Sequence, residues 1–562
     1  MTIFPERLKA LHSRTPDRVA VYLQFSGRDD LPITYDQLVR GAGAYARTLE
    51  REAVQPGEVV VLILQHGEDL VCSFWGAILH GAIPSIMPFL TEKLSPERYR
   101  ADLSALISVT RPAAIVTYPE FKMDVRSALQ DGDSVRSVIV TNCVEPGSTE
   151  IDFDSLAGFH CQPEDIVLLQ HSSGTTGLQK GVALSHQAVF NQLDAYGKSL
   201  SITENDVLVS WLPLYHDMGL IAGFLMPILS GIPLVLMSPF DWVRGPYKLL
   251  QSISKYHGTL VWLPNFAFNF CAQKIRDRHI EGVDLSSLRA VINCSEPVRW
   301  ESHMAFYERF KDYGLKLDAL QTSYAMAENV FGVTQSRLGS APAIDEIDRE
   351  AFMLQRVAKT PLDGRPSMKM MSSGQPLENV EVKVMDESGQ ALPDRTIGEI
   401  ALRSDCMLTG YFNRPDLTEK AFRDGWYLTG DYGYLSGGEV FVSGRKKDMI
   451  IVGGKNVYPQ DLEALTYEVS GVHAGRSVAF GMFDEAQGTE EVVIIAEVDS
   501  EDAEAQQKIA DAIRLHVTKN SAIALRYVKV VGPKWILKTS SGKTARSANK
   551  EKFLRELEDK GV

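Results

Sequence analysis

The sequence is poor in cysteine: its 562 residues include only six, and no two of them form a C-x-x-C pair. This excludes a disulfide scaffold and the Cys/His spacing of structural zinc sites, and it suits a reducing cytoplasm. The chain also lacks an excess of positive charge: 72 Asp and Glu outnumber 58 Lys and Arg, and the formal net charge is −14. We therefore expect no nucleic-acid partner, which would need a broad basic face. The composition, 44% hydrophobic and 23% charged, is typical of a folded globular protein, and we expect a cytoplasmic enzyme.

Long hydrophobic runs are almost missing too. Charged residues interrupt the N-terminus before an apolar core forms, so we expect no secretory signal. Residues 219–237 carry no charge and are long enough to span a bilayer. However, two prolines and three glycines divide this run, and no strongly basic flank accompanies it. We interpret it as a buried helix, a turn at residues 230–231 and a buried strand, and expect no integral membrane anchor.

Short apolar runs alternate with amphipathic stretches along most of the chain. Clear examples are residues 59–64, 113–117, 137–141, 166–169, 260–263 and 290–293. Runs rich in Val, Ile and Leu are typical of strands buried on both faces, and the amphipathic stretches supply crossover helices. This predicts a large α/β body with mainly parallel sheets. A smaller α/β pattern restarts after residues 444–448, so we expect a body of residues 1–444 and a C-terminal domain of residues 445–562.

The stretch SSGTTGLQKGV at residues 172–182 is the most informative part of the sequence. Its glycines let backbone N–H groups turn toward an anion, and its hydroxyls and lysine add charge-assisted contacts. No Walker A register fits it. Apolar runs stand on both sides of the stretch, which disfavours a flexible linker. The sequence therefore predicts a loop that binds phosphate.

Six motifs in this order resemble those of the adenylate-forming superfamily, which contains acyl-CoA synthetases, non-ribosomal adenylation domains, luciferases and fatty acyl-AMP ligases. They are SSGTTGLQKGV at 172–182, SEP at 295–297, SYAMAE at 323–328, YLTGD at 427–431, GRKKD at 444–448 and TSSGK at 539–543. The resemblance covers nearly the whole chain. It implies the α/β adenylate-forming fold, in which a large N-terminal body of α/β subdomains carries a small, mobile α+β domain as a lid.

The resemblance also implies which residues bind ATP. Those of the phosphate loop are Ser172, Ser173, Gly174, Thr175, Thr176, Gly177 and Lys180. Those of the adenine pocket, where the tyrosine stacks on the base, are Ser295, Glu296, Pro297, Ser323, Tyr324, Ala325 and Met326. The alanine departs from the glycine that the family usually has. Asp431 and Arg445 are implied to bind the ribose, and Glu328 and Thr175 to bind Mg²⁺.

Activation of a carboxylate by ATP brings two anions together, so cations must lie where the charge gathers. The resemblance implies that Lys543 bridges the carboxylate and the α-phosphate, and that Glu328 acts through Mg²⁺. His216, within SWLPLYHDMGL, is implied to lie beside the incoming carboxylate, and these three are the predicted catalytic residues. The alternative for His216 is an ordinary core histidine.

Other positions are assigned to the lid and to the acyl chain. Lys447 is implied to be the hinge pivot, and Gly454 to line the passage for the pantetheine arm. Candidates for the acyl pocket are Gly219, Leu220, Gly223 and Phe266, although an aromatic run is also typical of plain core.

Three details resemble the fatty acyl-AMP ligase branch: the LPLYHDMGL form of the acyl motif, the NVYPQDLE stretch at 456–463, and an additional segment at about 336–369. In that branch the additional segment restrains the lid and disfavours free CoA; the alternative is a plain surface loop. We expect acyl-AMP formation from a carboxylic, fatty acid, then transfer to the phosphopantetheine thiol of an acyl carrier protein. The alternatives are a medium- or long-chain acyl-CoA synthetase, a membrane acyl transport protein anchored by residues 219–237, and an inactive adenylate-binding regulator.

Overall fold

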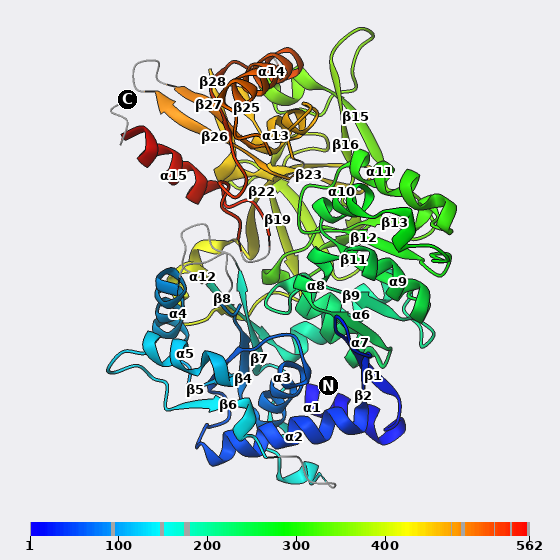
Figure 1. Ribbon diagram of the computed structural model, residues 1–562, viewed down its shortest axis with the longest axis vertical. Coiled ribbons are helices and arrows are strands. Elements are labelled where there is room, and N and C mark those ends of the chain that lie inside the picture. Colours follow the sequence, from blue (N-terminus) through cyan, green and yellow to red (C-terminus); the bar gives the residue numbers. More distant parts are fainter. Residues whose placement is uncertain are drawn as a thin grey trace.

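The computed structural model describes residues 2–90, 96–145, 151–172, 180–453, 455–473, 475–484, 489–521, 523–539 and 542–558. Figure 1 shows two large sheets with helices around them in the N-terminal part of the chain, and a small C-terminal unit beside them. This arrangement confirms the predicted α/β class.

The first large sheet carries the strand that leads into the phosphate loop. Its strand order is β6-β5-β3-β4-β7-β8-β20. The strands are β3 (Val59–Ile63), β4 (Ile83–Ile86), β5 (Ala114–Thr117), β6 (Ser137–Val140), β7 (Ile166–Ser172), β8 (Lys180–Ser185) and β20 (Gly410–Tyr411). The strands from β6 to β7 are parallel, whereas β8 and β20 run antiparallel to their neighbours.

Strand β3 shows why these strands read as continuous apolar runs. Its side chains point alternately into two cores, with Val60 and Leu62 in one and Val61 and Ile63 in the other. Both faces are therefore buried. The first core contains side chains of α2 (Tyr35–Arg51) and α3 (Glu68–His80), and the second those of α4 (Pro96–Thr110) and α5 (Lys122–Ala128).

The second large sheet has the order β13-β12-β11-β9-β10-β1-β2 and is parallel except for β2. Its strands are β1 (Val19–Gln24), β2 (Leu31–Thr34), β9 (Leu208–Ser210), β10 (Leu234–Met237), β11 (Leu260–Leu263), β12 (Ala290–Asn293) and β13 (Leu320–Thr322). The helices that accompany it are α1 (Phe4–Arg14), α6 (His186–Ser199), α7 (Met226–Ser230), α8 (Pro239–Arg244), α9 (Tyr247–Tyr256), α10 (Asn265–Lys274) and α11 (Trp300–Phe310).

The uncharged run at residues 219–237 folds as predicted. It forms a buried π-helix (Met218–Leu225), then α7, then a left-handed turn at Gly231 with φ 78°, and then the buried strand β10. Within the described ranges, no helix is both long enough and apolar enough to cross a membrane.

A third sheet adds antiparallel pairings to the two large, mainly parallel sheets. It consists of β18 (Val380–Met385), β19 (Gly398–Ser404), β21 (Phe422–Arg423), β22 (Trp426–Ser436) and β23 (Glu439–Arg445). The short turn between β22 and β23 leaves no room for the crossover helix that parallel neighbours need. Helix α12 (Pro415–Ala421) precedes this hairpin, and two small ladders pair β14 (Thr334–Gln335) with β17 (Gln375–Pro376) and β15 (Ile344–Asp348) with β16 (Ser367–Met371).

The C-terminal elements build their own cores (Figure 1). The hairpin β24 (Ile450–Val452) and β25 (Lys455–Val457) precedes a mixed sheet of β26 (Ser477–Asp484), β27 (Thr489–Glu497) and β28 (Leu525–Val531). Helices α13 (Pro459–Tyr467) and α14 (Ala503–Ser521) contribute side chains to one core, and α15 (Arg546–Glu558) to the other. The α/β pattern predicted for this part of the chain is confirmed.

Candidate active site

Three residues from separate motifs, Tyr324, Asp431 and Arg445, lie together. Tyr324 follows β13 and donates its hydroxyl hydrogen to Asp431 Oδ2 at 2.6 Å. Asp431 and Arg445 are paired across β22 and β23, and Arg445 Nε lies 3.1 Å from Asp431 Oδ1. Burial and the Asp431 carboxylate raise the pKa of the Tyr324 hydroxyl well above its usual value, so this group stays a hydrogen-bond donor. The cluster offers the carboxylate and cation expected at a ribose.

A second group surrounds Glu328. The hydroxyl of Tyr411 donates to Glu328 Oε1 at 2.8 Å and lies 3.0 Å from the hydroxyl of Tyr427. Lys180, the predicted phosphate ligand, lies over the Tyr411 ring, with 4.7 Å between Nζ and the ring centroid. Sequence reasoning missed Tyr411, because its place depends on the pairing of β20 with β8 beside the phosphate loop. Its only sequence signal is an aromatic residue in a short Gly-Tyr strand.

The charges of the predicted catalytic residues His216 and Lys543 both lower the pKa of Asp217. His216 Nδ1 lies 2.5 Å from Asp217 Oδ1. Burial raises the pKa of the Asp217 carboxyl, but the charge and hydrogen bond of His216, the charge of Lys543 and the Met218 N–H outweigh it, and the pKa falls to about 2. The ammonium of Lys543 therefore lies within electrostatic reach of a carboxylate far away in the sequence. Asp217 was not predicted, although an acid next to a candidate histidine is a readable signal.

The predicted adenine residues lie at the carboxyl ends of neighbouring parallel strands, where α/β sheets commonly bind ligands. Ser295, Glu296 and Pro297 follow β12, and Ser323 begins directly after β13. Ser295 has a left-handed backbone with φ 70°, and Glu296 Oε2 accepts a hydrogen bond from the Phe266 N–H at 2.9 Å. The glutamate thus caps the start of α10.

The chain around this motif is also fixed. Ser323 donates its hydroxyl hydrogen to the Thr334 carbonyl at 2.7 Å, and the Met326 N–H donates to the Phe331 carbonyl at 2.8 Å. Ala325 pairs with Gly332 in an isolated antiparallel bridge. The loop that carries Tyr324 is therefore held by its own backbone and side-chain hydrogen bonds.

The candidate acyl-pocket residues form a buried apolar wall beside this edge. Gly219 and Gly223 allow the π-helix to approach the preceding segment, since a Cβ at Gly219 would lie 2.1 Å from the Pro213 carbonyl oxygen. Leu220 is buried beside them. Phe266 contacts Trp211 and Trp242 edge to face, with ring centroids 6.3 and 6.1 Å apart. These indoles stack on each other at 3.6 Å.

A comparison with protein families identifies this arrangement. Residues 8–412 match the model of the family described as AMP-binding enzyme. The chain belongs to the AMP-binding enzyme family. Together with the fold, this makes the protein an AMP-forming ligase of the adenylate-forming type, as the motifs predict.

Individual relatives of this AMP-binding enzyme match over nearly their whole length. It is 29% identical to the medium-chain-fatty-acid–[acyl-carrier-protein] ligase JamA of Moorena producens (strain JHB), over 97% of this chain and 93% of JamA. It is 30% identical to the putative fatty-acid–CoA ligase FadD25 of Mycobacterium tuberculosis (strain ATCC 25618 / H37Rv), over 92% of this chain and 90% of FadD25. A solved structure from a study of fatty acyl-adenylate ligases from E. coli and L. pneumophila matches with a TM-score of 0.90 and 25% identity, over 100% of this chain and 98% of the other.

The motifs of this AMP-binding enzyme imply Mg²⁺. Among the described residues, no group of three or more His, Cys, Asp or Glu side chains could hold a metal ion. Mg²⁺ in nucleotide sites is held through one or two carboxylates together with substrate phosphates and water. The Glu328 carboxylate fits such a site. It accepts the hydroxyl hydrogen of Tyr411, and Lys180 lies over the ring of the same tyrosine. The ion would be held by Glu328 and the phosphates of ATP.

Several predicted residues lie outside the described part of the chain, namely Ser173, Gly174, Thr175, Thr176, Gly177 and Gly454. The two ends of the phosphate loop are nevertheless placed. The backbone of Ser172 ends β7, and it pairs with Lys180 at the start of β8. The loop therefore begins and ends on adjacent antiparallel strands.

The predicted hinge of this AMP-binding enzyme follows β23. Lys446 Nζ lies 2.9 Å from Glu399 Oε2, on β19. Burial, then the charge of Arg445, lowers the pKa of Lys447. Gly444 has φ 150°, and a Cβ there would lie 2.3 Å from Gln460 Nε2, so any other residue would be strained and would have to displace the Gln460 amide. The basic residues before Lys447 are thus paired with the third sheet.

The additional segment contacts the C-terminal part of the chain. It forms the β15–β16 hairpin and a π-helix, Ala351–Gln355. Arg356 Nη2 donates to Asn456 Oδ1 at 3.1 Å, and Asn456 Nδ2 donates to the Met353 carbonyl at 3.3 Å. Phe352 and Tyr458 bring their ring centroids to 5.9 Å. The segment is therefore not a plain surface loop.

The same NVYPQDLE stretch also contacts the body. Arg299 directly precedes α11. Its Nη2 lies 2.9 Å from Asp461 Oδ1 and donates to the Gln460 carbonyl at 3.1 Å. Asn456 and Asp461, which belong to the stretch that resembles the fatty acyl-AMP ligase branch, thus each contact a different part of the N-terminal chain. The interface could not be read from the sequence, because Arg299 belongs to no motif.

Proposed function

We propose that this AMP-binding enzyme activates a fatty acid with ATP and passes it to an acyl carrier protein. A carboxylate oxygen attacks the α-phosphorus, the bond to the β-phosphate oxygen breaks, and acyl-AMP and pyrophosphate form. The phosphopantetheine thiol then attacks the acyl carbon, AMP leaves, and the thiol proton goes to solvent. The observation that supports this most strongly is the cluster at Asp431, which accepts the hydroxyl hydrogen of the buried Tyr324 and pairs with Arg445.

The first half-reaction needs positive charge between two anions. The Lys543 ammonium is assigned to the acid carboxylate and the α-phosphate, and Lys180 to the departing pyrophosphate. Asp431 and Arg445 are assigned to the ribose. Fixed charges of this kind cost little reorganisation when the reaction occurs, and each contributes roughly 3–4 kcal/mol to transition-state stabilisation. Bound Mg²⁺ would supply further neutralisation of the phosphates.

The second half-reaction needs the thiol to approach the carbonyl that Lys543 faces. We assign residues 445–562 to a lid that rotates about Lys447, with the pantetheine arm passing Gly454. Such hinge motions expose a different face of one domain to a fixed site. The pairing of Lys446 with Glu399 supports a pivot after this residue, since it ties the preceding chain to the body.

The contacts of the additional segment support a carrier protein as acceptor. Arg356 and Met353 bind Asn456, so rotation of the lid must break these hydrogen bonds. The likeness to JamA, named as an acyl-carrier-protein ligase, supports the same acceptor. The second candidate is an acyl-CoA synthetase, which the likeness to FadD25, named as a putative CoA ligase, favours.

The test offers the purified enzyme ATP, Mg²⁺ and a panel of carboxylic acids of increasing chain length. CoA or a holo-carrier protein is then added in parallel, and the products are read by mass spectrometry. Acyl-AMP that persists with CoA and is consumed with the holo-carrier is the expected result. Rapid acyl-CoA formation would favour the synthetase, and absence of acyl-AMP with every acid would reject both candidates.

A further inference from the structure

The lysine at the centre of the proposed reaction lies on a short closed loop. The loop leaves the core at Leu537 and returns at Ala545, whose N–H donates to the Leu537 carbonyl at 3.0 Å. Within it, Lys538 and Thr544 form a bridge, and the Thr539 N–H donates to the Lys543 carbonyl at 2.8 Å. Helix α15 begins directly afterwards. The direction of Lys543 therefore depends on what holds the two ends of this loop.

Asn549 holds both ends at once. Its side chain is fully buried on the first turns of α15. Oδ1 accepts a hydrogen bond from the Leu537 N–H at 2.8 Å, and Nδ2 donates to the carbonyls of Leu537 and Ala545 at 2.9 and 2.8 Å. One primary amide thus pairs with both strands at the base of the loop. A side chain that lacks either the donor or the acceptor cannot replace it.

Arg546 and Glu463 fix the loop to the middle of the C-terminal unit. Arg546 Nη1 lies 3.0 Å from Glu463 Oε1 on α13, and the same oxygen accepts the Ala479 N–H at 2.8 Å. Burial raises the pKa of the Glu463 carboxyl, while the Arg546 charge opposes this rise. The ion pair between this buried carboxylate and the Arg546 guanidinium fixes the first residue of α15.

We propose that Asn549, Arg546 and Glu463 are positioning residues that direct Lys543 at the reacting carboxylate. This rests on the role of Lys543 proposed above. The three side chains fix the two ends of the loop, and the backbone of the loop fixes the position of the Lys543 ammonium. Lysine has a long flexible stem, so an effective position requires its backbone to be fixed. Because a misplacement of about 1 Å can cost about 100-fold in rate, the loss would appear in kcat of acyl-AMP formation.

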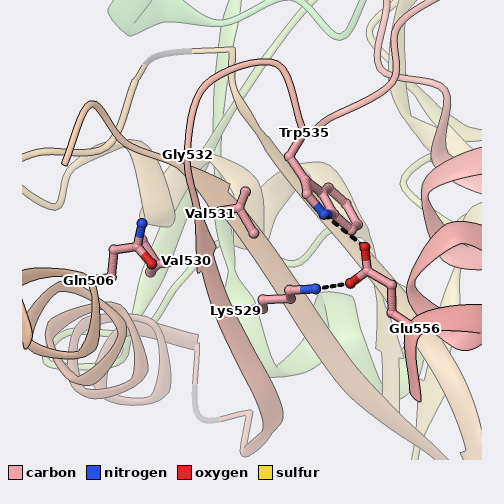
Figure 2. Close-up of a pocket in the computed structure, with 7 residues that line it drawn as sticks. All are labelled: Gln506, Lys529, Val530, Val531, Gly532, Trp535 and Glu556. Carbon is pink, nitrogen blue, oxygen red and sulfur yellow. Dashed lines mark hydrogen bonds and ion pairs between the residues drawn. The ribbon is translucent and has the colours of Figure 1, made fainter. Parts of the chain in front are cut away.

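The far end of α15 offers a matched control (Figure 2). There Glu556 accepts a hydrogen bond from Trp535 Nε1 at 3.0 Å and pairs with Lys529. These groups border an open pocket of about 550 Å³ between β28 and α15. The contact resembles that of Glu463, a carboxylate paired with a cation, and it anchors the same helix. It lies almost two helical turns beyond Asn549, so its loss should leave the loop in place.

The test measures the two half-reactions separately in Asn549→Asp, Glu463→Gln, Arg546→Met and Arg546→Lys. Acyl-AMP formation should fall about 10- to 100-fold in kcat, with KM for ATP unchanged, in the first three variants. Arg546→Lys should recover part of this loss. Transfer from synthetic acyl-AMP to the thiol, which does not need Lys543, should stay within about twofold. Glu556→Gln should match the wild type in both assays.

Double variants decide whether the effect passes through Lys543. Each change combined with Lys543→Ala should add no further loss to acyl-AMP formation. Additive losses, or equal losses in both half-reactions with a lower melting temperature, would overturn the proposal. If Lys543→Ala alone keeps wild-type acyl-AMP formation, the proposed role of Lys543 fails. If Lys543→Ala loses activity while the other variants keep theirs, only the positioning role fails.

Discussion

The body and the C-terminal unit hold their reactive groups in different ways. Asp431 in the body binds both Tyr324 and Arg445, the residue directly after the body, and the register of β22 and β23 fixes the Asp431–Arg445 pair. Lys543 instead stands on a loop held by α15, and its charge helps to lower the pKa of Asp217 in the body. Two of the proposed nucleotide-binding groups are therefore fixed by the pairing of neighbouring strands, whereas the position of the Lys543 ammonium, the proposed catalytic cation, depends on how the two parts meet.

This difference predicts which changes separate the half-reactions. Loss of a body group should weaken every step that involves the adenylate, because in the proposed site the same contacts bind ATP and acyl-AMP. Loss of a group on the C-terminal unit should affect only the half-reaction in which that group faces the active site. Four measurements can break or sharpen the contrast.

Lys543→Ala should have the largest effect. It removes the cation between the carboxylate and the α-phosphate, and acyl-AMP formation should fall by about 100- to 1,000-fold or more. Transfer from preformed acyl-AMP should remain near the wild-type rate. Both can be followed by rapid quench and mass spectrometry. Adenylation at close to the wild-type rate would show that the lysine is misassigned.

Asp431→Ala should follow, and it should impair both half-reactions. It removes the acceptor of the Tyr324 hydroxyl and the partner of Arg445, both of which would stay in the site without a counterpart. We expect the binding free energy of ATP to weaken by roughly 2–3 kcal/mol. This corresponds to a loss of about 30- to 150-fold in kcat/KM, mainly through a higher KM for ATP. Steady-state kinetics with ATP and with synthetic acyl-AMP provide the comparison. A defect confined to adenylation would contradict the contrast.

Ionisation of Asp217 should account for part of the folding stability that the protein loses at acidic pH. The Asp217 pKa of about 2 lies below the usual aspartate value of 3.8, so the ionised form stabilises the folded chain above about pH 4. This contribution, roughly 2 kcal/mol, is lost as the pH falls from 4 towards 2. Urea unfolding of Asp217→Asn should show lower stability at pH 7 and a flatter slope across that window. An unchanged slope would contradict the assignment.

Arg356→Ala should have the smallest effect. It removes the hydrogen bond to Asn456, worth about 1 kcal/mol, so rotation of the C-terminal unit becomes easier. Acyl-CoA formation should rise about fivefold, while adenylation changes less than twofold. Arg365→Ala is the matched control, because Arg365 lies on the same segment but faces Asp348 and Glu350 within it. A similar rise in acyl-CoA formation in Arg365→Ala would contradict a role for the hydrogen bond between Arg356 and Asn456.

The sequence predicts elements whose residues carry their own signal. Strand β3 reads as a buried parallel strand because each of its side chains is apolar, and Asp431 and Tyr324 stand inside dense motifs. The antiparallel third sheet was missed, since its strands alternate and their turns are short. Tyr411, Arg299 and Asn549 were missed for another reason. Their roles come from pairings between segments distant in the chain, which no local pattern records.

The central claim is that a carboxylate oxygen attacks the α-phosphorus, and isotope transfer tests it most directly. The enzyme is given ATP and a fatty acid whose carboxylate carries heavy oxygen, together with the thiol acceptor. The account predicts that one labelled oxygen appears in AMP after each turnover and that pyrophosphate stays unlabelled. Label in inorganic phosphate, with ADP as the second product, would mean that the acid attacks the γ-phosphorus and would contradict the account.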